Sequence, residues 1–264
     1  MMTSPQSILI TGASSGIGAA LAESYAAPGI TLALGGRDKA RLEEIVKKCR
    51  DKGAIANFST IDVTDKIAMS SWIGHADKIA PLDLVIANAG VSAGTGGAGE
   101  PESQTRLLFA TNIDGVINTV FPALEAMKKR KKGQLALMAS LAGFRGFPGA
   151  PAYCASKAAV KVWGEALRGS LIADGIKVNV LCPGYVDTPM TRVNGFSMPG
   201  IMTAEKAAGI IKRGLEANKS RIAFPFSTYF GAWLLQTLPP SWFDWLLTKL
   251  PQKGALDLQD TSGL

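Results

Sequence analysis

The stretch Thr11-Gly12-Ala13-Ser14-Ser15-Gly16-Ile17-Gly18 directly follows an apolar run at residues 7–11 and leads into a helical pattern at residues 15–27. Three glycines at this spacing allow a tight turn and let backbone amides come close to a pyrophosphate. The amino terminus of the following helix adds partial positive charge at the same place. A glycine-rich stretch alone is weak evidence, but its place between a strand and a helix is typical of a dinucleotide-binding turn. We therefore predict a phosphate-binding loop made of Gly12, Ser14, Ser15, Gly16, Ile17 and Gly18.

Outward from this turn, short apolar runs alternate with helical stretches almost to the end of the chain. Strands are predicted at residues 7–11, 31–34, 54–60, 82–87, 134–139, 177–181 and 222–224. Helices are predicted at residues 15–27, 38–52, 65–79, 102–130, 151–173 and 203–217. This alternation requires right-handed crossovers, so we predict an α/β fold, a doubly wound Rossmann-type, mainly parallel sheet with helices on both faces. No linker divides residues 1–264, and we expect a single domain.

The corner after the second predicted strand reads Gly35-Gly36-Arg37-Asp38. Dinucleotide folds usually have a carboxylate at this corner that holds the ribose hydroxyls of the adenosine. No carboxylate precedes Arg37, and its guanidinium can pair with a ribose phosphate. The corner therefore favours NADP(H) over NAD(H). The alternative is that Arg37 is only solvent-exposed, while Asp38 caps the next helix in either case.

The segment Tyr153-Cys154-Ala155-Ser156-Lys157 lies in a predicted helix. A spacing of four residues puts the Tyr153 phenol and the Lys157 ammonium on one face of that helix. A nearby ammonium favours the tyrosinate and would lower the pKa of Tyr153, which makes it a usable acid or base. Such a pair is common and usually structural, so its meaning depends on the motifs that accompany it.

Taken together, these motifs resemble those of the short-chain dehydrogenase/reductase family over about residues 5–225, and the glycine turn has the family's TGxxxGIG form. The resemblance assigns the adenine contact to Asp62 and Val63, and the motif after the fourth strand to Asn88, Ala89 and Gly90. It assigns the nicotinamide end of the cofactor to Pro183, Gly184 and Thr188. The family's four catalytic positions correspond to Asn112, Ser140, Tyr153 and Lys157.

The resemblance implies an oxidoreductase that transfers a hydride between a nicotinamide and a carbonyl or alcohol carbon. Ser140 would donate a hydrogen bond to the substrate oxygen, and Tyr153 would give that oxygen its proton. Lys157 would lower the pKa of Tyr153 and bind the nicotinamide ribose. Asn112, in the middle of its helix, would hold a water that resupplies the proton. The alternative, a non-catalytic nucleotide-binding scaffold, is disfavoured because all four residues are present.

Composition narrows the partners. The formal charge is +7, but much of the excess lies in the run Lys128–Lys132, which ends a predicted helix, where cations are favourable. We therefore expect no nucleic-acid partner. The single histidine, His75, and three widely spaced cysteines predict neither a metal site nor a disulfide framework. The segment MMTSPQSILITG lacks the features of a signal peptide, and we expect a cytoplasmic protein. The resemblance also implies a homo-oligomer that pairs through the helices holding Asn112 and Tyr153.

The substrate and the carboxyl-terminal extension, residues 226–264, are less well defined. Residues 186–202 are apolar and suggest a nonpolar carbonyl substrate, and the glycine-rich loop after Gly90 does not identify it. No residue from 222 to 243 is charged, and helices are predicted at residues 227–238 and 241–250, with Ser241 and Asp244 as a capping pair. Neither helix is long enough to span a bilayer. Our hypothesis is a helical cap beside the active site that buries an apolar substrate and offers a peripheral membrane or subunit contact. The run Lys128–Lys132 is expected at the opposite edge of the sheet.

Overall fold

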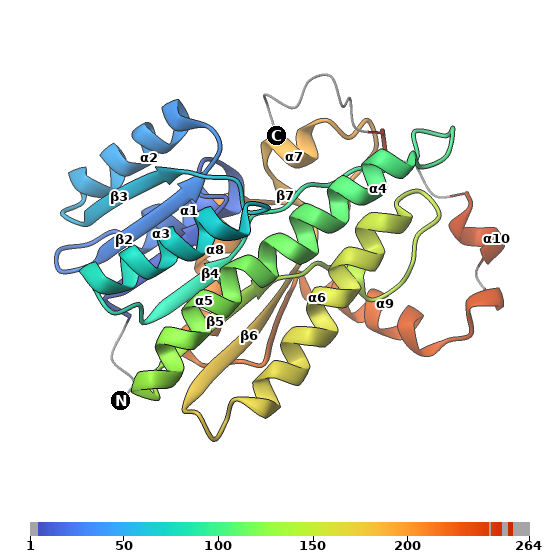
Figure 1. The fold of residues 1–264 in the computed structure, drawn as a ribbon. Helices are drawn as coiled ribbons and strands as arrows, with labels where there is room; N and C mark the ends of the chain where they lie inside the picture. The colour runs from blue at the N-terminus through green and yellow to red at the C-terminus, as the bar shows by residue number, and fades with distance from the viewer. Residues whose placement is uncertain (1–4, 243, 250–252, 256–264) are drawn as a thin grey trace.

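Seven parallel strands form the central sheet, in the order β3-β2-β1-β4-β5-β6-β9 (Figure 1). The computed structural model describes residues 5–242, 244–249 and 253–255. All six neighbouring strand pairs are parallel, which confirms the predicted doubly wound sheet. The strands are β1 (Ser7–Thr11), β2 (Thr31–Gly36), β3 (Ile55–Thr60), β4 (Leu84–Ala87), β5 (Gly133–Met138), β6 (Ile176–Pro183) and β9 (Arg221–Phe224).

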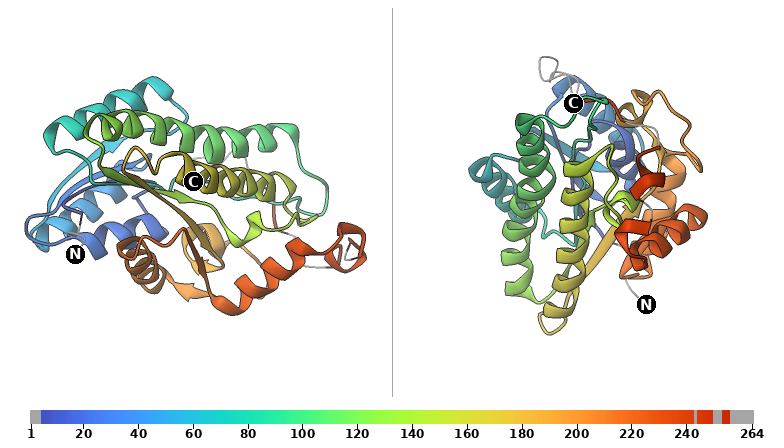
Figure 2. Two further views of the ribbon diagram at one scale, coloured as in Figure 1. Left: turned by 90° about the horizontal axis from the view of Figure 1, so that it is seen from below. Right: turned by 90° about the vertical axis from the view of Figure 1, so that its right-hand side faces the viewer.

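Helices cover both faces of the sheet (Figure 2). On one face lie α1 (Gly16–Tyr25), α2 (Lys39–Asp51) and α8 (Ala204–Glu216), and on the other lie α3 (Lys66–Ile79), α5 (Gly115–Arg130) and α6 (Pro151–Ser170). Each face has its own buried apolar cluster, and β1 contributes Ile8 and Ile10 to one and Leu9 to the other. A strand buried on both faces needs continuous apolar residues, which explains why the run at residues 7–11 shows no polar alternation.

The order of the strands reverses between β1 and β4. From β1 the chain builds outward through β2 to β3, then crosses back to place β4 on the other side of β1. Ligands of open α/β sheets bind at the carboxyl ends of the strands where the order reverses. The glycine turn follows β1 and the Asn88-Ala89-Gly90 motif follows β4, so both motifs lie at this point.

The predicted helix at residues 102–130 is one continuous helical run with a change of winding. It comprises α4 (Glu102–Phe109), a π-helical segment (Ala110–Asp114) and α5. By length and composition this run could cross a membrane, but 56% of its most apolar window is buried inside the fold. Since α5 packs against α3 and the sheet (Figure 1), core packing accounts for its apolar residues.

Several predicted boundaries shift. The helix expected at residues 15–27 ends at Tyr25, because Ala26 is already extended two residues before Pro28. The strand expected at residues 177–181 is longer, since β6 pairs with both β5 and β9. The sequence did not predict the small pair β7 (Val186–Asp187) and β8 (Met202–Thr203), with the short helix α7 (Pro189–Arg192) between them.

The carboxyl-terminal segment follows β9 along the side of the molecule where α6 begins (Figure 1). Helix α9 (Phe226–Thr237) agrees with the prediction for residues 227–238. Of the helix predicted at residues 241–250, the structure shows only a short part, which follows a 3-10 turn. A 3-10 turn (Pro240–Trp242), closed by a bond from the Trp242 amide to the Pro239 carbonyl, contains Ser241 and so prevents it from capping a helix. The following helix α10 covers only Asp244–Leu247, and residue 250 lies outside the described part.

Candidate active site

The turn between β1 and α1 leaves backbone amides available for an anion. Gly12 and Gly16 have φ angles of 65° and 55°, which favour glycine. A Cβ atom at Gly16 would lie 2.9 Å from the Cγ2 atom of Thr188, so the turn approaches the segment after β7 closely. Ser15 is the N-cap of α1, and its side chain makes no capping hydrogen bond to the first turn. The uncapped amides and the helix dipole fit a pyrophosphate.

Asn88 and Thr11 lock the turn to the end of β4. The Asn88 Nδ2 atom donates to the carbonyl oxygens of Thr11 and Gly12 at 2.9 and 3.1 Å. In return, the Thr11 hydroxyl oxygen accepts hydrogen bonds from the amides of Asn88 and Ala89 at 3.0 and 3.1 Å. These bonds hold the two strand ends on either side of the switch point in one arrangement.

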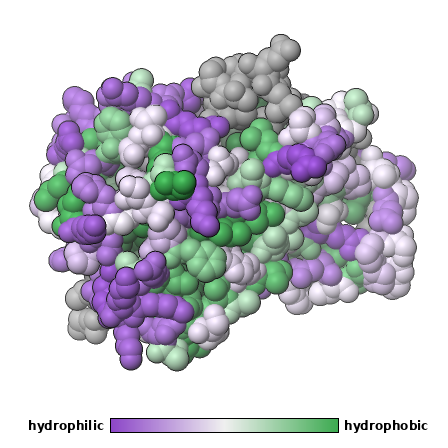
Figure 3. Space-filling view, viewed as in Figure 1, coloured by the Kyte–Doolittle hydropathy of each residue, from purple (hydrophilic) through white to green (hydrophobic). Residues whose placement is uncertain are grey.

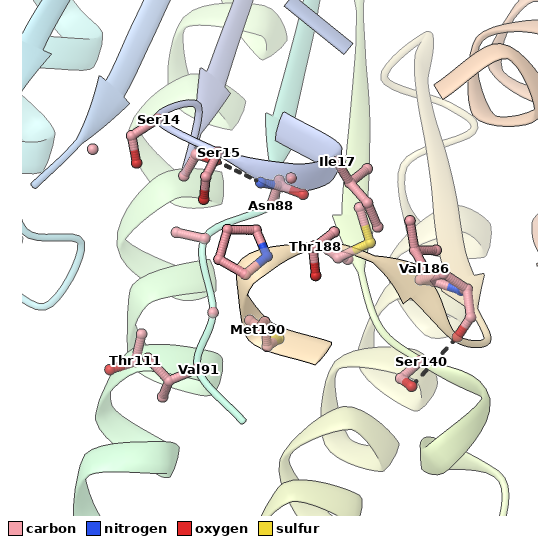
Figure 4. Close-up of a pocket in the computed structure, with 18 of the residues that line it drawn as sticks. Ser14, Ser15, Ile17, Asn88, Val91, Thr111, Ser140, Val186, Thr188 and Met190 are labelled. Carbon is pink, nitrogen blue, oxygen red and sulfur yellow. Dashed lines mark hydrogen bonds between the residues drawn. The ribbon is translucent and has the colours of Figure 1, made fainter. Parts of the chain in front are cut away.

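A single cleft brings together most of the predicted site residues, and Figure 4 shows several of them converging from the turn, β4 and the Thr188–Met190 segment. The predicted residues that line it are Gly12, Ser14, Ser15, Gly16, Ile17, Arg37, Asp62, Val63, Asn88, Ala89, Gly90, Ser140, Tyr153, Lys157, Pro183, Gly184 and Thr188. Gly18 and Asn112 do not line the cleft. Gly18 packs behind the turn, where a Cβ atom would lie 2.2 Å from the Gly12 carbonyl oxygen.

Ten further residues that the sequence did not name individually as site residues line the cleft: Gly36, Ile61, Val91, Thr111, Met138, Ala139, Val186, Pro189, Met190 and Thr191. Of these, Val186, Pro189, Met190 and Thr191 lie in residues 186–202, the segment that the sequence connected with the substrate, and Val91 begins the loop after Gly90. Many of them adjoin the carboxyl end of a strand, so proximity to a strand end was the available signal. The apolar members, among them Val91, Met138, Val186 and Met190, give the cleft a partly hydrophobic wall.

At the corner after β2, Arg37 and Asp38 have separate roles. Arg37 is exposed and lines the cleft. The Asp38 carboxylate accepts a hydrogen bond from the Arg41 amide at 3.0 Å, which confirms Asp38 as the N-cap of α2. It also forms an ion pair with the Arg41 guanidinium at 3.1 Å. The carboxylate at this corner is therefore engaged in capping, while Arg37 lines the cleft.

The catalytic candidates gather where β5 and α6 meet the cleft. Tyr153 and Lys157 lie one turn apart on α6, and the Lys157 Nζ atom is 5.9 Å from the centroid of the Tyr153 ring. The buried Lys157 ammonium donates to the Met138 carbonyl oxygen at 2.9 Å, and burial lowers its pKa to about 8. Ser140 follows β5, and its hydroxyl accepts a bond from the Ala142 amide at 3.1 Å and donates to the Pro183 carbonyl at 3.4 Å (Figure 4).

The pKa of Tyr153 is shifted in the direction opposite to the prediction. Burial raises the pKa of Tyr153 above its ordinary value, since the ionised phenol loses its hydration. Hydrogen bonds with the Ser140 and Ser92 side chains act in the lowering direction but do not outweigh burial. Lys157 is not among the groups that lower it, and its ammonium bonds the Met138 carbonyl instead. Tyr153 is therefore protonated at neutral pH.

Asn112 is fully buried in the π-helical segment, in the middle of the helical run as expected. Its Oδ1 atom accepts from the Val91 amide at 2.8 Å, and its Nδ2 atom donates to the Val91 carbonyl at 2.9 Å and to the Ser156 hydroxyl at 3.0 Å. Both amide protons are thus used by the protein. Gly90 permits this packing, since a Cβ atom there would lie 2.9 Å from the Asn112 Oδ1 atom. The predicted role of Asn112 in holding a water stays a prediction.

The remaining predicted features lie away from the cleft. His75 is exposed on α3. The three cysteines are free and buried. The basic run ends α5 at the opposite edge of the sheet, where Arg130 pairs with Asp77 and Lys132 with Asp83 at 2.9 Å each.

Comparison with known proteins shows what this chain is similar to. The sequence profile of the short chain dehydrogenase family matches residues 6–195. An uncharacterized oxidoreductase of Myxococcus xanthus is 34% identical over 237 residues, which cover 89% of this chain and 94% of that protein. A short-chain dehydrogenase from Sphingobium yanoikuyae, solved in complex with NADPH, superposes with a TM-score of 0.77 at 25% identity, covering 95% of this chain and 98% of that one. A short-chain dehydrogenase/reductase from Burkholderia phymatum, solved with NAD, has a TM-score of 0.79 at 24% identity, covering 96% and 98%.

Proposed function

This chain belongs to the short-chain dehydrogenase/reductase family, whose members act on CH–OH or C=O groups with NAD(P); we propose that it prefers NADP(H) and acts on an apolar carbonyl or alcohol compound, with Tyr153 as the acid and base. One observation carries this proposal. Tyr153, Ser140 and Lys157 meet at the edge of the cleft that holds the phosphate-binding turn.

Each of these residues has a proposed task. The nicotinamide, when bound, supplies or accepts the hydride. Tyr153 is protonated at neutral pH because burial raises its pKa, so its hydroxyl can give a proton to the oxygen of a carbonyl substrate. Ser140 is held at the end of β5 by its bond from Ala142, where its hydroxyl can orient the same oxygen. Lys157 would hold the ribose of the bound cofactor, and its ammonium, which donates to the Met138 carbonyl, has its Nζ atom 5.9 Å from the centroid of the Tyr153 ring.

Replacing Tyr153 by Phe tests this assignment. The variant should lose most turnover with either cofactor while binding NADPH normally, because only the hydroxyl is removed. Cofactor oxidation would be measured across a panel of acyl, steroid, sugar and aromatic ketones, and cofactor binding by fluorescence titration. Tyr25→Phe is the matched control, since Tyr25 is buried on α1 outside the cleft. Near-parental turnover in Tyr153→Phe would show that another group is the acid.

The NADP(H) preference is supported by Arg37, which lines the adenosine end of the cleft while Asp38 caps α2. A charge-assisted contact with a phosphate contributes about 1.5–3 kcal/mol, so Arg37→Ala should raise the KM for NADPH about tenfold or more. The KM for NADH should change far less, because NADH lacks the ribose phosphate. An unchanged ratio of the two KM values would refute the preference.

The apolar substrate class is supported by the wall of the cleft. Val91, Met138, Val186 and Met190 line it near Tyr153 and Ser140. A hydrophobic wall with a few placed polar groups is the usual make-up of a small-molecule site. The panel of ketones therefore should show the highest kcat/KM for apolar compounds. Intact cofactor binding with no turnover of any compound would favour the alternative of a non-catalytic scaffold.

A homo-oligomer and a cytoplasmic location complete the proposal. Figure 3 shows hydrophobic surface over the middle of the molecule, where α5 and α6 face the viewer. Phe121 on α5 and Val162 on α6 are 54% and 58% exposed, and Phe121 contacts the Trp163 ring with centroids 6.0 Å apart. Exposed apolar residues gathered on two adjacent helices support pairing through this face. Light scattering of Phe121→Asp should show a smaller assembly than the parent protein, and equal masses would oppose this interface.

A further inference from the structure

A short segment of the carboxyl-terminal extension, residues 253–255, lies beside the active site. Residues 253–255, which we call the C-terminal strap, lie along the loop that follows β4. The Gly94 amide donates to the Gly254 carbonyl at 2.8 Å, and the Gly96 amide donates to the Lys253 carbonyl at 2.9 Å. These two bonds attach the strap to the loop through the backbone, independently of the side chains.

The loop sequence permits this close approach. A Cβ atom at Gly94 would lie 2.3 Å from the Lys253 carbonyl oxygen and 2.5 Å from that of Gly149, so any larger residue would push the strap away. Gly96 has a φ angle of 58°, a conformation that favours glycine. The glycine-rich loop therefore serves as the docking surface of the strap.

Docking of the strap brings a second lysine to Tyr153. The Lys253 Nζ atom is 5.9 Å from the centroid of the Tyr153 ring, the same distance as the Nζ atom of Lys157. It donates a hydrogen bond to the Ser92 hydroxyl oxygen at 2.7 Å. Lys253 is half-buried, and burial lowers its pKa to about 8. Among the residues that the structure describes, no carboxylate forms an ion pair with it.

The chemistry of the two groups sets the direction of the hydrogen bonds. A lysine ammonium can only donate, so the Ser92 oxygen accepts from Lys253. The hydroxyl proton of Ser92 is then left for another acceptor, and Ser92 interacts with the Tyr153 side chain. A hydrogen bond donated to a phenolate favours its ionised form.

We propose that Lys253 is a positioning residue for the acid–base step: its ammonium orients the Ser92 hydroxyl as a donor to Tyr153, so that the C-terminal strap stabilises the tyrosinate. The inference rests on the proposed role of Tyr153. In carbonyl reduction the Tyr153 proton moves to the substrate oxygen, and the phenolate that remains accepts the Ser92 hydrogen bond. Ser92 keeps its proton and Lys253 keeps its charge, so neither is consumed.

Other groups also face Tyr153 and must be held constant in a test. Lys157 lies beside it on α6, and Ser140 approaches from the end of β5. The Cys154 and Tyr185 side chains act to raise the pKa of Tyr153 if they ionise. None of these is changed by a substitution at Lys253 or Ser92, so a shift common to both variants reports on the Lys253–Ser92 pair.

The experiment compares Lys253→Met, Ser92→Ala, the double variant and Lys253→Arg. The readout is the pH dependence of kcat/KM for alcohol oxidation, in which ionised Tyr153 is the required base, followed from pH 6 upward so that it includes the range below about 8 in which Lys253 carries its charge. Both single variants should raise the apparent pKa of Tyr153 by about one, so that kcat/KM at any pH below that pKa falls about tenfold. The double variant should show no further rise, because the two residues act through one hydrogen bond. Lys253→Arg keeps a donor-only cation and should retain most of the parental profile. Lys249→Met, an exposed lysine of the same segment, is the matched control.

Three results would overturn the proposal: an unmoved apparent pKa in Lys253→Met, additive shifts in the double variant, or Lys253→Arg as impaired as Lys253→Met. A lower rate with an unmoved apparent pKa would mean that the C-terminal strap has only a structural role at the site. Failure of the proposed function is distinguishable, since the parent protein would then turn over no alcohol or Tyr153→Phe would stay active. In that case the pKa of Tyr153 can be compared without turnover, by following tyrosinate absorbance during a pH titration of the parent protein and of Lys253→Met. The absorbance of the same protein with Tyr153→Phe is subtracted from each titration. An equal pKa in the two proteins would again refute the proposal.

Discussion

Asn112 should contribute more to the stability of this protein than its place in a catalytic set suggests. The substitution Asn112→Ala removes three hydrogen bonds, to the Val91 amide, the Val91 carbonyl and the Ser156 hydroxyl, at 2.8, 2.9 and 3.0 Å. Asn112 has no exposed surface, so water cannot replace these bonds without entering the core. At about 1 kcal/mol for each bond, the free energy of unfolding should fall by about 3 kcal/mol. Buried groups left without partners add to this loss.

The assay is urea unfolding followed by circular dichroism, with a thermal melt as a second measure. A loss of about 3 kcal/mol corresponds to a fall in Tm of about 6–12 °C for a chain of this size. Asn118→Ala is the matched control, because Asn118 is buried on the same helical run but makes one close bond, from its Nδ2 atom to the Val63 carbonyl at 2.9 Å. Its loss should be about 1–2 kcal/mol. The reasoning would be refuted if Asn112→Ala cost no more than Asn118→Ala.

Three further changes test other parts of the structure. Gly18→Ala places a Cβ atom 2.2 Å from the Gly12 carbonyl oxygen and should weaken NADPH binding about tenfold or more, whereas Gly74→Ala, in a helix with open space, should not; equal binding in both would contradict the packing role of Gly18. The pKa of Lys157 is about 8 in the folded protein and 10.5 for an ordinary lysine, so the unfolded chain binds more protons between these two pH values. Burying Lys157 therefore lowers the free energy of unfolding by its full amount below pH 8, and by less as the pH rises towards 10.5. The Tm of Lys157→Met minus the Tm of the parent protein should therefore be a few degrees larger at pH 7 than at pH 10, as measured by thermal melts. A difference in Tm that does not change with pH would oppose this. Truncation after Pro225 should change activity together with the oligomeric state or the binding to liposomes, measured by kinetics, light scattering and sedimentation; a soluble truncated protein unchanged in all three would leave the carboxyl-terminal cap hypothesis unsupported.

The exposed side of the carboxyl-terminal segment motivates that truncation. Phe226, Phe230 and Trp233 project from one side of α9, and their rings contact one another with centroids 6.3 and 6.0 Å apart. The other side is attached to the body, where Tyr229 meets the Phe144 ring edge-on at 5.7 Å. The Arg145 guanidinium also bonds the Leu238 carbonyl at 3.1 Å. The helix thus has one packed side and one apolar side open to a partner.

The sequence by itself determined the fold and the place of the cleft. Glycines in the turn from Thr11 to Gly18 and the alternation of apolar runs with helical patterns are local signals, because they depend on backbone conformation and on residues close in the chain. They predicted the chain order of the seven strands of the central sheet and of the helices that cover its two faces. Local signals were less informative where pairing over long distances decides the outcome. The β7–β8 pair and the length of β6 were therefore missed.

Only the tertiary structure decided the electrostatics of the site. A spacing of four residues placed Lys157 beside Tyr153, but the direction of the Tyr153 pKa depends on burial, which is set by elements from the whole chain. Likewise, nothing near Lys253 in the sequence points to a site, since its neighbours in space are Ser92 and Tyr153, which are 161 and 100 residues away along the chain. Covalent neighbours fix backbone conformation over a few residues, whereas desolvation and hydrogen bonding at the reacting oxygen are properties of the packed chain, and they exist only once the strap, the loop and α6 have met.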